Sequence, residues 1–358
     1  MPSTHRCDVV RVRLRPHPNA DSLSIVGVFG WECVVRTSEW KDGDLAVFVP
    51  PESVIPDTEE VRTLGGPPGR VRAVRLRGIL SPGLLLRAPD GASEGDDLMA
   101  RLGVTHYEPP LPLSAGGETE AGPQGVWPHY DIENLRSRTN ASLLLPGEEV
   151  LATEKIHGAC ARYVWADGRQ WVGSHAEWKR ESHNNIYWRA LAQCPQLGEW
   201  CRAHPELAAY GEVFGLVVQG ADYSYGAQQN DVLFAAFDIL DHGRWLDFDD
   251  SRRDGSGLPW VPLLYRGPFD EAAIKELAEG DSTVPGADHI REGLVVKPVR
   301  ERWCAEIGRA QLKVVSNQYL AGKAEKKAKK REGRRERSPV ARPPADAPRT
   351  HEQADGPA

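Results

Sequence analysis

Short runs in which apolar and polar residues alternate occupy the first hundred residues of the chain. Residues 7–14 (CDVVRVRL) alternate as a half-buried strand does. Further strand-like runs follow at residues 23–29, 31–36, 45–49, 70–76 and 83–87, separated by turn sequences such as KDGD and GGPPG. Several short strands with regular turns are typical of a small β-barrel or sandwich. We therefore expect residues 1–106 to form a β-barrel.

The pattern changes after this first region. Residues 107–128 are rich in Pro, Gly and Ser, which predicts a linker. Residues 129–320 then mix strand-like and helix-like runs, which indicates an α+β domain. The strand-like runs are 150–152, 161–165, 207–210, 232–239 and 294–299, and the helix-like runs are 186–192, 197–203 and 271–279.

The last segment, residues 321–358, is expected to be a disordered tail. It opens with a strongly basic stretch, GKAEKKAKKR, and ends in Pro, Ala and Asp. A charge-rich, apolar-poor segment cannot bury enough surface to fold alone. The tail would either hold phosphate backbones electrostatically or only keep the protein in solution.

Composition narrows the class of protein. The 358 residues carry a formal net charge of −7, which argues against a surface coated in positive charge but leaves room for a local basic groove. The six cysteines show no C-x-x-C pair, so we expect reduced thiols and a cytoplasmic location. No run approaches the ~20 apolar residues of a membrane helix.

The stretch Glu154-Lys155-Ile156-His157-Gly158 is the first candidate for chemistry. It lies between the strand-like runs 149–153 and 161–165, which predicts a lysine at the rim of a hairpin, with Gly158 allowing close backbone approach. A lysine becomes a nucleophile when desolvation or nearby positive charge lowers its pKa. Alone, the stretch favours the simpler interpretation of an exposed lysine in a turn, because short motifs match by chance, and only the rest of the chain changes this.

Four further segments follow in order, and together with Lys155 they resemble the nucleotidyltransferase motifs of the covalent ligase superfamily. They are YGEVFG (210–215), FAAFDIL (234–240), REGLVVKP (291–298) and QLKVV (311–315). The phrase HPNADSL (17–23) also resembles one in tRNA-binding-type OB domains, so the resemblance implies an OB-like barrel. The fold expected is thus α+β: an OB-like β-barrel, then an α+β nucleotidyltransferase (ATP-grasp-like ligase) domain, then the basic tail.

Within the superfamily, the chain resembles ATP-dependent RNA ligases, and most of all the Deinococcus radiodurans-type RNA ligase. The N-terminal barrel, the segment YDIEN (130–134) and the ending LKVVS (312–316) carry this resemblance. DNA ligases and capping guanylyltransferases have an OB domain after the last motif. The polar segment that follows Lys313 is too short for one, so we expect an RNA ligase.

The resemblance implies a role for each motif residue. Lys155 would be the nucleophile, and Lys297 and Lys313 would supply positive charge to the ATP α-phosphate. Mg²⁺ or Mn²⁺ would be bound by Glu212, Glu292 and Asp238. Glu292 would also be a catalytic residue. Phe237 would stack on adenine. The nucleotide site would also include Glu154, His157, Gly158 and Glu212, and phosphate or RNA contacts would come from Ser174, His175 or Lys179.

The chain departs from the family pattern at several of these places. His157 stands where many ligases have Asp, and Cys160 where one branch has Asn. Gln311 stands where the last motif usually has a first lysine, which leaves Lys313 alone there. His175 stands where an Arg would be expected.

The resemblance implies an ATP- and metal-dependent RNA ligase. Such an enzyme forms a covalent lysyl-AMP, transfers AMP to a 5′-phosphate end and seals it to a 3′-OH, here at a nick in an RNA or RNA-containing duplex. We expect a monomer with no membrane contact. The alternatives are a nucleic-acid-binding protein with a decayed ligase core, and a DNA ligase or capping-type nucleotidyltransferase.

Overall fold

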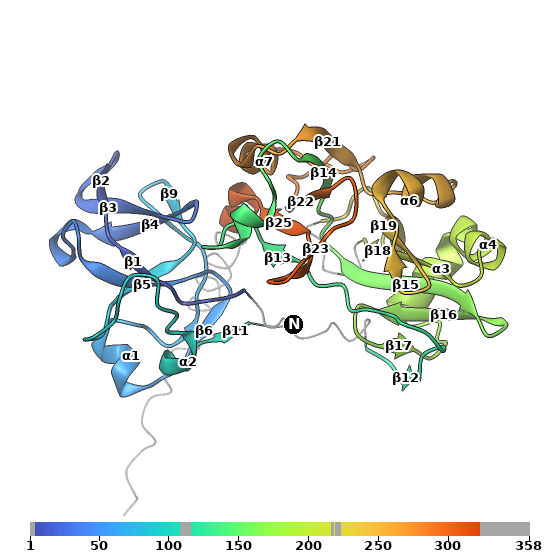
Figure 1. The fold of residues 1–358 in the computed structure, drawn as a ribbon, viewed down its shortest axis with the longest axis horizontal. Helices are drawn as coiled ribbons and strands as arrows, with labels where there is room; N and C mark the ends of the chain where they lie inside the picture. Colours follow the sequence, from blue (N-terminus) through green and yellow to red (C-terminus); the bar gives the residue numbers. More distant parts are fainter. Residues whose placement is uncertain (1–3, 108–115, 216–217, 219–222, 323–358) are drawn as a thin grey trace, which may run out of the picture.

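The computed structural model describes residues 4–107, 116–215, 218 and 223–322. The strands form two bodies, a smaller one at the left of Figure 1 and a larger one at the right. The basic tail expected at residues 321–358 lies, from residue 323 onward, outside the described residues. None of the helices in the described part is long and apolar enough to cross a membrane.

The smaller, N-terminal body consists of short antiparallel strands around one central strand, β5 (Leu45–Val49). β5 pairs with β1 on one side and with β10 on the other. Val47 and Val49 face one buried cluster, whereas Ala46 and Phe48 face a second one. Because both faces of β5 are buried, its sequence is a continuous apolar run without alternation.

The other elements of this body surround β5. The strands are β1 (Val9–Arg11), β2 (Leu14–His17), β3 (Ala20–Val28), β4 (Trp31–Arg36), β6 (Ser53–Ile55), β7 (Gly69–Arg70), β8 (Val74–Leu76), β9 (Ile79–Ser81), β10 (Leu84–Arg87) and β11 (Thr105–His106), with helices η1 (Thr37–Glu39), α1 (Glu59–Thr63) and α2 (Met99–Leu102).

The prediction of a single strand at residues 70–76 is wrong. It is divided between β7, which pairs with β6, and β8, which pairs with β9. Val71 and Ala73 between them are buried, so the apolar alternation is real, but the chain changes pairing partners within it. Alternation marks which side chains face the core and does not say which strand lies alongside.

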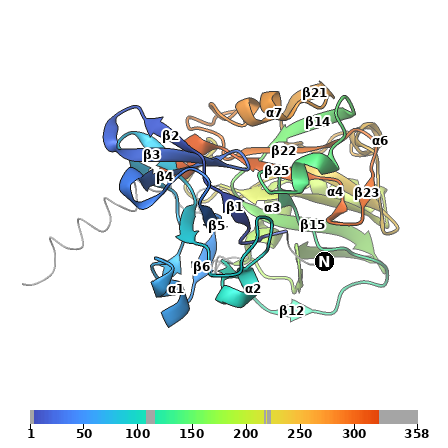
Figure 2. The same cartoon turned by 60° about the vertical axis from the view of Figure 1, so that its left-hand side comes forward.

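The larger body contains two sheets. The seven-stranded sheet has the order β12-β17-β16-β15-β18-β19-β20, and the five-stranded sheet has the order β13-β25-β22-β14-β21. Figure 2 shows β14, β22 and β25 lying above β15. The strands of the first sheet are β12 (Thr119–Glu120), β15 (Ala159–Ala166), β16 (Arg169–Ser174), β17 (Trp178–Lys179), β18 (Leu207–Phe214), β19 (Leu233–Asp241) and β20 (Arg244–Trp245). Those of the second are β13 (Glu133–Asn134), β14 (Glu149–Glu154), β21 (Leu263–Pro268), β22 (Gly293–Pro298) and β25 (Leu312–Val315).

Helices cover each sheet through apolar faces. Helices α3 (Ile186–Gln193) and α4 (Pro195–Ala203) pack on the seven-stranded sheet, where Ile186, Leu197 and Trp200 join the largest buried cluster. Helix α7 (Glu271–Leu277) contributes Ile274 to the core of the five-stranded sheet. The remaining elements are η3 (Asn140–Leu143), α6 (Phe248–Asp254) and the hairpin of β23 (Trp303–Cys304) and β24 (Gly308–Arg309).

The segment expected as a linker does more than connect the two bodies. Residues 108–115 lie outside the described part, but Thr119–Glu120 form β12, which pairs with β17 at the edge of the seven-stranded sheet. A Pro- and Gly-rich composition therefore did not prevent a short edge strand, since only two residues have to pair.

Arg136 connects the two bodies. Its guanidinium lies 4.6 Å from the ring of Trp31 and donates to the carbonyl of Val315 and the side chain of Asn317. The indole N–H of Trp31 donates to the Arg136 carbonyl oxygen at 3.1 Å. Leu320 packs against the cluster on the β5 face that holds Phe48. Buried hydrogen bonds and apolar contacts thus fix the barrel against the end of β25.

The core of the larger body should respond strongly to loss of a helix side chain. We expect Leu197→Ala to lower the free energy of unfolding by about 2–5 kcal/mol, because it removes a fully buried side chain and leaves a cavity. Leu145→Ala is the control, since Leu145 is 55% exposed and its loss should change stability by less than about 0.5 kcal/mol. Urea unfolding would measure both, and equal effects would contradict the assignment of α4 to the core.

Candidate active site

Lys155 lies where the chain passes from one sheet to the other. β14 ends at Glu154 and pairs with β21 and β22, whereas β15 begins at Ala159 and pairs with β16 and β18. The expectation of a hairpin rim is therefore wrong, because the two strands that flank the lysine belong to different sheets. The backbone N–H of Lys155 donates to the carbonyl of Gly293 at 3.0 Å, which places the lysine beside the start of β22.

Gly158 allows the chain to make this crossing. A Cβ atom at this position would lie 2.3 Å from the carbonyl oxygen of Val213 and 2.8 Å from the side chain of Glu212. No real Cβ tolerates such contacts with backbone, so any larger residue would displace β18 or its glutamate. The glycine thereby brings Glu212 close to Lys155.

Two carboxylates surround the amine of Lys155. Its Nζ lies 3.0 Å from Oε1 of Glu292, and Glu212 is close enough to act on its charge. Burial alone lowers the pKa of Lys155, but Glu292 and Glu212 outweigh it and raise that pKa. The same crowding raises the pKa of Glu212 to about 8, through burial first and then repulsion by Glu292, against the attraction of Lys155. The amine is therefore protonated in this arrangement.

His157 lies against the same pair of groups. Its backbone N–H donates to the hydroxyl of Tyr225 at 2.7 Å. Its ring Nδ1 is 2.8 Å from the hydroxyl of Tyr319 and 3.3 Å from Glu292. An aromatic residue far along the chain thus orients the histidine that stands where many ligases have Asp. Sequence reasoning missed Tyr319, for which no motif gives a signal.

A cavity of about 350 Å³ begins at these residues and extends between the two bodies. Lys155, Glu292 and Lys313 line one part of it, and Arg6, Arg70 and Tyr107 belong to the barrel side. Lys313 lies on β25 opposite Val295 of β22. Burial and then repulsion by the nearby Lys155 lower the pKa of Lys313, whereas Glu133, Glu292 and Asp131 act to raise it. Glu292 thus acts on both amines.

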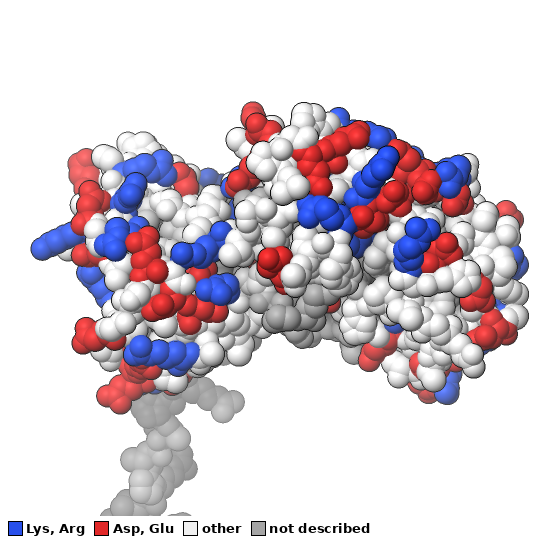
Figure 3. All heavy atoms as spheres, in the orientation of Figure 1, with Lys and Arg blue, Asp and Glu red and all other residues white. Residues whose placement is uncertain are grey.

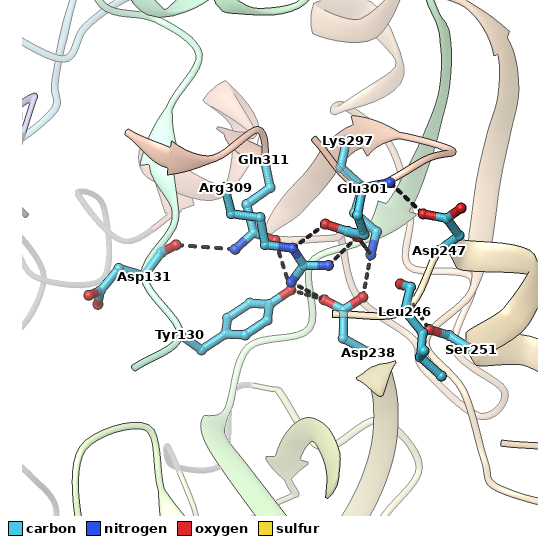
Figure 4. A network of polar contacts seen from close by, with 10 residues as sticks. All are labelled: Tyr130, Asp131, Asp238, Leu246, Asp247, Ser251, Lys297, Glu301, Arg309 and Gln311. Atoms are coloured by element: carbon cyan, nitrogen blue, oxygen red, sulfur yellow. Dashed lines mark hydrogen bonds and ion pairs between the residues drawn. The ribbon is translucent and has the colours of Figure 1, made fainter. Parts of the chain in front are cut away.

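Lys297 and Asp238 lie in a buried network instead of on this cavity (Figure 4). The amine of Lys297 contacts Oδ1 of Asp238 and lies 3.1 Å from Glu301. Arg309 donates to Oδ2 of Asp238 at 2.7 Å and also binds Glu301. Burial would raise the pKa of Asp238, yet the two cations hold it below its ordinary value. Sequence reasoning did not identify Arg309 or Glu301, which belong to the connection between β22 and β25.

The other expected nucleotide residues lie as follows. Phe237 is half-buried on β19, with its ring centroid 4.5 Å from that of Tyr130. Glu154 is 2% exposed and accepts hydrogen bonds from Ser282 and Thr283, so it anchors that loop. Cys160 of β15 lies opposite Glu212 of β18 in the register of the two strands.

The expected phosphate or RNA contacts do not line the cavity that holds Lys155. Ser174 accepts hydrogen bonds from the backbone N–H groups of Ala176 and Glu177, which closes a turn. Lys179 is 2% exposed and forms an ion pair with Glu177 at 2.7 Å. The ring of His175 lies 6.3 Å from that of His129. Their assigned contacts remain predictions.

Glu212 and Glu292 suit a hard divalent cation. In the described part of the chain, no three His, Cys, Asp or Glu side chains gather as a complete metal cage. Mg²⁺ commonly uses one or two carboxylates and completes its octahedron with water and substrate phosphates. Two neighbouring carboxylates fit that habit once both are ionised, whereas both oxygens of Asp238 are already engaged by cations.

The raised pKa of Glu212 gives a stability prediction. Its pKa rises on folding from 4.5 to about 8, so between these values the folded protein binds a proton that the unfolded chain releases. In chelator-containing buffer, wild type should therefore lose stability relative to Glu212→Gln as the pH rises through this interval. We expect a change on the order of 1 kcal/mol in the difference of unfolding free energies, since the half-buried side chain is partly screened. A difference that stays constant with pH would contradict the assignment.

Comparisons with known proteins agree with this architecture. Residues 148–315 match the family model described as RNA ligase, and residues 8–88 match an OB-fold domain model. The comparison with curated proteins gives no match.

Solved structures give the same result over nearly the whole chain. The Naegleria gruberi RNA ligase with PPi has a TM-score of 0.70 and 25% identity, covering 90% of this chain and 99% of that one. An apo mutant of that ligase has a TM-score of 0.70 and 25% identity, covering 90% and 98%. A mutant with ATP and Mn has a TM-score of 0.70 and 24% identity, covering 88% and 98%. The predicted fold is confirmed: the chain consists of an OB-fold domain followed by an RNA ligase nucleotidyltransferase domain.

Proposed function

We propose that this protein is an ATP-dependent RNA ligase in which Lys155 forms a covalent bond to AMP. The observation that carries the proposal is the position of Lys155, whose amine lies 3.0 Å from Glu292 and under the influence of Glu212, at the edge of a cavity and inside a domain that matches RNA ligases. The similar Naegleria gruberi ligase has been solved with ATP, AMP, Mn and PPi, which supports ATP and a divalent metal here.

The charges around Lys155 define what has to happen before it can react. Its amine is held as an ammonium by Glu292 and Glu212, and an ammonium has no lone pair for attack. Mg²⁺ or Mn²⁺ on these carboxylates would supply positive charge next to the α-phosphate. Glu292 would then no longer favour the protonated amine, and Lys155 could release its proton to water. Lys313, whose own pKa is lowered, would face the α-phosphate as a cation.

The cavity between the two domains would hold the β- and γ-phosphates. In-line attack requires the pyrophosphate to leave on the side opposite the lysine amine. Arg6 and Arg70 line the cavity beyond Lys155 and can bind phosphate oxygens. Acidic and basic side chains are interspersed over the described atoms of the face shown in Figure 3, so that face offers phosphate no broad basic patch.

The nucleotide site would be completed by the remaining motif residues. Phe237 would stack on adenine, with Glu154, His157 and Gly158 shaping the site around Lys155. Lys297 and Asp238 would support the nucleotide site indirectly, since they are bound to each other within the buried network. Ser174, His175 or Lys179 would serve RNA at a later step.

We further propose that the substrate is a nick in an RNA-containing duplex, as in the Deinococcus radiodurans type. AMP would pass from Lys155 to the 5′-phosphate, and the 3′-OH would displace it to form the phosphodiester. A 2′-OH on the 3′-OH strand would distinguish RNA from DNA. The enzyme would act as a cytoplasmic monomer.

The covalent step is tested by incubating the protein with α-labelled ATP and Mg²⁺ or Mn²⁺, followed by a denaturing gel. Wild type should retain label and Lys155→Ala should retain none, because alanine has no amine to bond. Nicked RNA, DNA and hybrid duplexes would then establish which strands are sealed. Absence of label in wild type, with mass spectrometry showing no AMP already attached, would favour a nucleic-acid-binding protein instead. Label on Lys155→Ala would exclude this lysine as the nucleophile.

The role of the cavity is tested on the barrel side. The double variant Arg6→Gln and Arg70→Gln should raise the KM for ATP about tenfold or more, because two charge-assisted contacts to phosphate are lost. Arg101→Gln is the matched control, since Arg101 is an exposed, ion-paired arginine of the same domain outside the cavity. Single-turnover labelling at varied ATP measures both, and an unchanged KM in the double variant would place the phosphates elsewhere.

A further inference from the structure

We propose that Tyr130 and Gln311 are positioning residues that fix the ring of Phe237 for the nucleobase. The inference rests on the proposed function, because it takes Phe237 as the surface on which adenine stacks. Neither residue would touch the reacting atoms. Their effect would pass through one aromatic ring and one carboxylate.

The ring of Tyr130 supports Phe237 from within the domain. The two ring centroids are 4.5 Å apart with planes inclined by 41°. The ring centroids of Tyr210 and Trp245 lie 5.9 and 5.4 Å from that of Tyr130. Phe237 is half-buried, so part of its ring is left to meet a ligand. A shift of Tyr130 would therefore be transmitted to that ring.

The hydroxyl of Tyr130 is held at one end of the network in Figure 4. It contacts Oδ2 of Asp238 and lies 2.9 Å from Oε1 of Gln311. The amide nitrogen of Gln311 donates to the carbonyl of Asp131 at 3.2 Å, which uses the other end of the side chain. Gln311 thus fastens both Tyr130 and the neighbouring backbone to the start of β25. Asp238, adjacent to Phe237 in β19, completes the connection between the two sheets.

The charges of the network explain why an amide suits position 311. Asp238 and Glu301 carry negative charge, and Lys297 and Arg309 carry positive charge, so these ion pairs are already balanced. Gln311 is 2% exposed. A lysine there would add a buried cation without a partner and would remove the acceptor that faces Tyr130. Gln311 is therefore a functional part of the network in this chain, although the motif it resembles has lysine there.

The inference predicts a distinctive kinetic pattern. Stacking on a base is present in both the bound ATP and the transition state, so its loss weakens binding and not the chemical step. Tyr130→Phe should raise the KM for ATP in lysine adenylylation about 3–10-fold, with the maximal rate within about twofold of wild type. Gln311→Lys should raise KM at least as much, instead of improving the enzyme.

Tyr163→Phe is the matched control. Tyr163 is also a buried tyrosine, and its hydroxyl donates to the carbonyl of Tyr187 at 2.9 Å within the core of the seven-stranded sheet. It should lose a similar amount of stability and keep the KM for ATP. Thermal unfolding of each variant would verify that the comparison is made between folded proteins.

Inorganic tripolyphosphate separates a base-positioning role from general damage to the site. It competes for the phosphate part of the site and has no base, so its inhibition constant should be unchanged in Tyr130→Phe. The inference fails if the KM for ATP stays the same in Tyr130→Phe or if Tyr163→Phe raises it equally. It also fails if inhibition by tripolyphosphate becomes weaker in Tyr130→Phe to the same extent as ATP binding. If wild type showed no labelling by ATP at Lys155, the proposed function itself would be overturned, so the two failures are distinct.

Discussion

The ion pairs of Asp238 are the interaction on which the rest of the second domain depends. Asp238 lies on β19 of the seven-stranded sheet, and its cationic partners Lys297 and Arg309 lie on β22 and β24. Leaving any one of these buried charges without its partner would cost several kcal/mol. The network therefore specifies how the two sheets face each other, and with it the distance between the strands that carry the remaining motif residues.

The crossing at Lys155 uses this fixed arrangement. Because the chain leaves one sheet at Glu154 and enters the other at Ala159, the lysine faces a carboxylate from each of them, Glu292 and Glu212. Glu292 also lies 3.3 Å from the ring of His157, whereas Asp238 is bound by a lysine and an arginine. The site therefore differs from the buried network: Asp238 already binds two cations, whereas Glu212 and Glu292 both act on the amine of Lys155 and, as ionised carboxylates, would suit a divalent cation.

The sequence was sufficient for the fold class, and three of the residues it singled out lie at one cavity. The motifs identified Lys155, Glu292 and Lys313, which the fold brings to one cavity. Apolar periodicity predicted α3, α4 and most strands. It failed where the answer depends on pairing. Residues 149–153 and 161–165 look like a hairpin because alternation contains no information about which sheet a strand joins.

Gln311 shows the same limit for side chains. By resemblance it looks like a missing cation, whereas in the structure its amide has partners in Tyr130 and Asp131. Those partners lie about 180 residues away in the chain. Only the folded arrangement shows them. Tyr319 and Arg309 were missed for the same reason, since their importance comes from contacts and not from local pattern.

The junction between the domains has a consequence for the cavity. Arg136 and Leu320 fasten the barrel to the segment around Val315, and Tyr319 in the same segment contacts His157 beside Glu292. The walls of the cavity come from both domains, so it exists only while they are docked. A ligand that binds across it would stabilise the docked state through mass action, by the difference in its affinity for docked and separated domains. The segment that follows β25 contacts the barrel through Leu320 and His157 through Tyr319, so domain docking and the geometry at Lys155 would be linked through this segment.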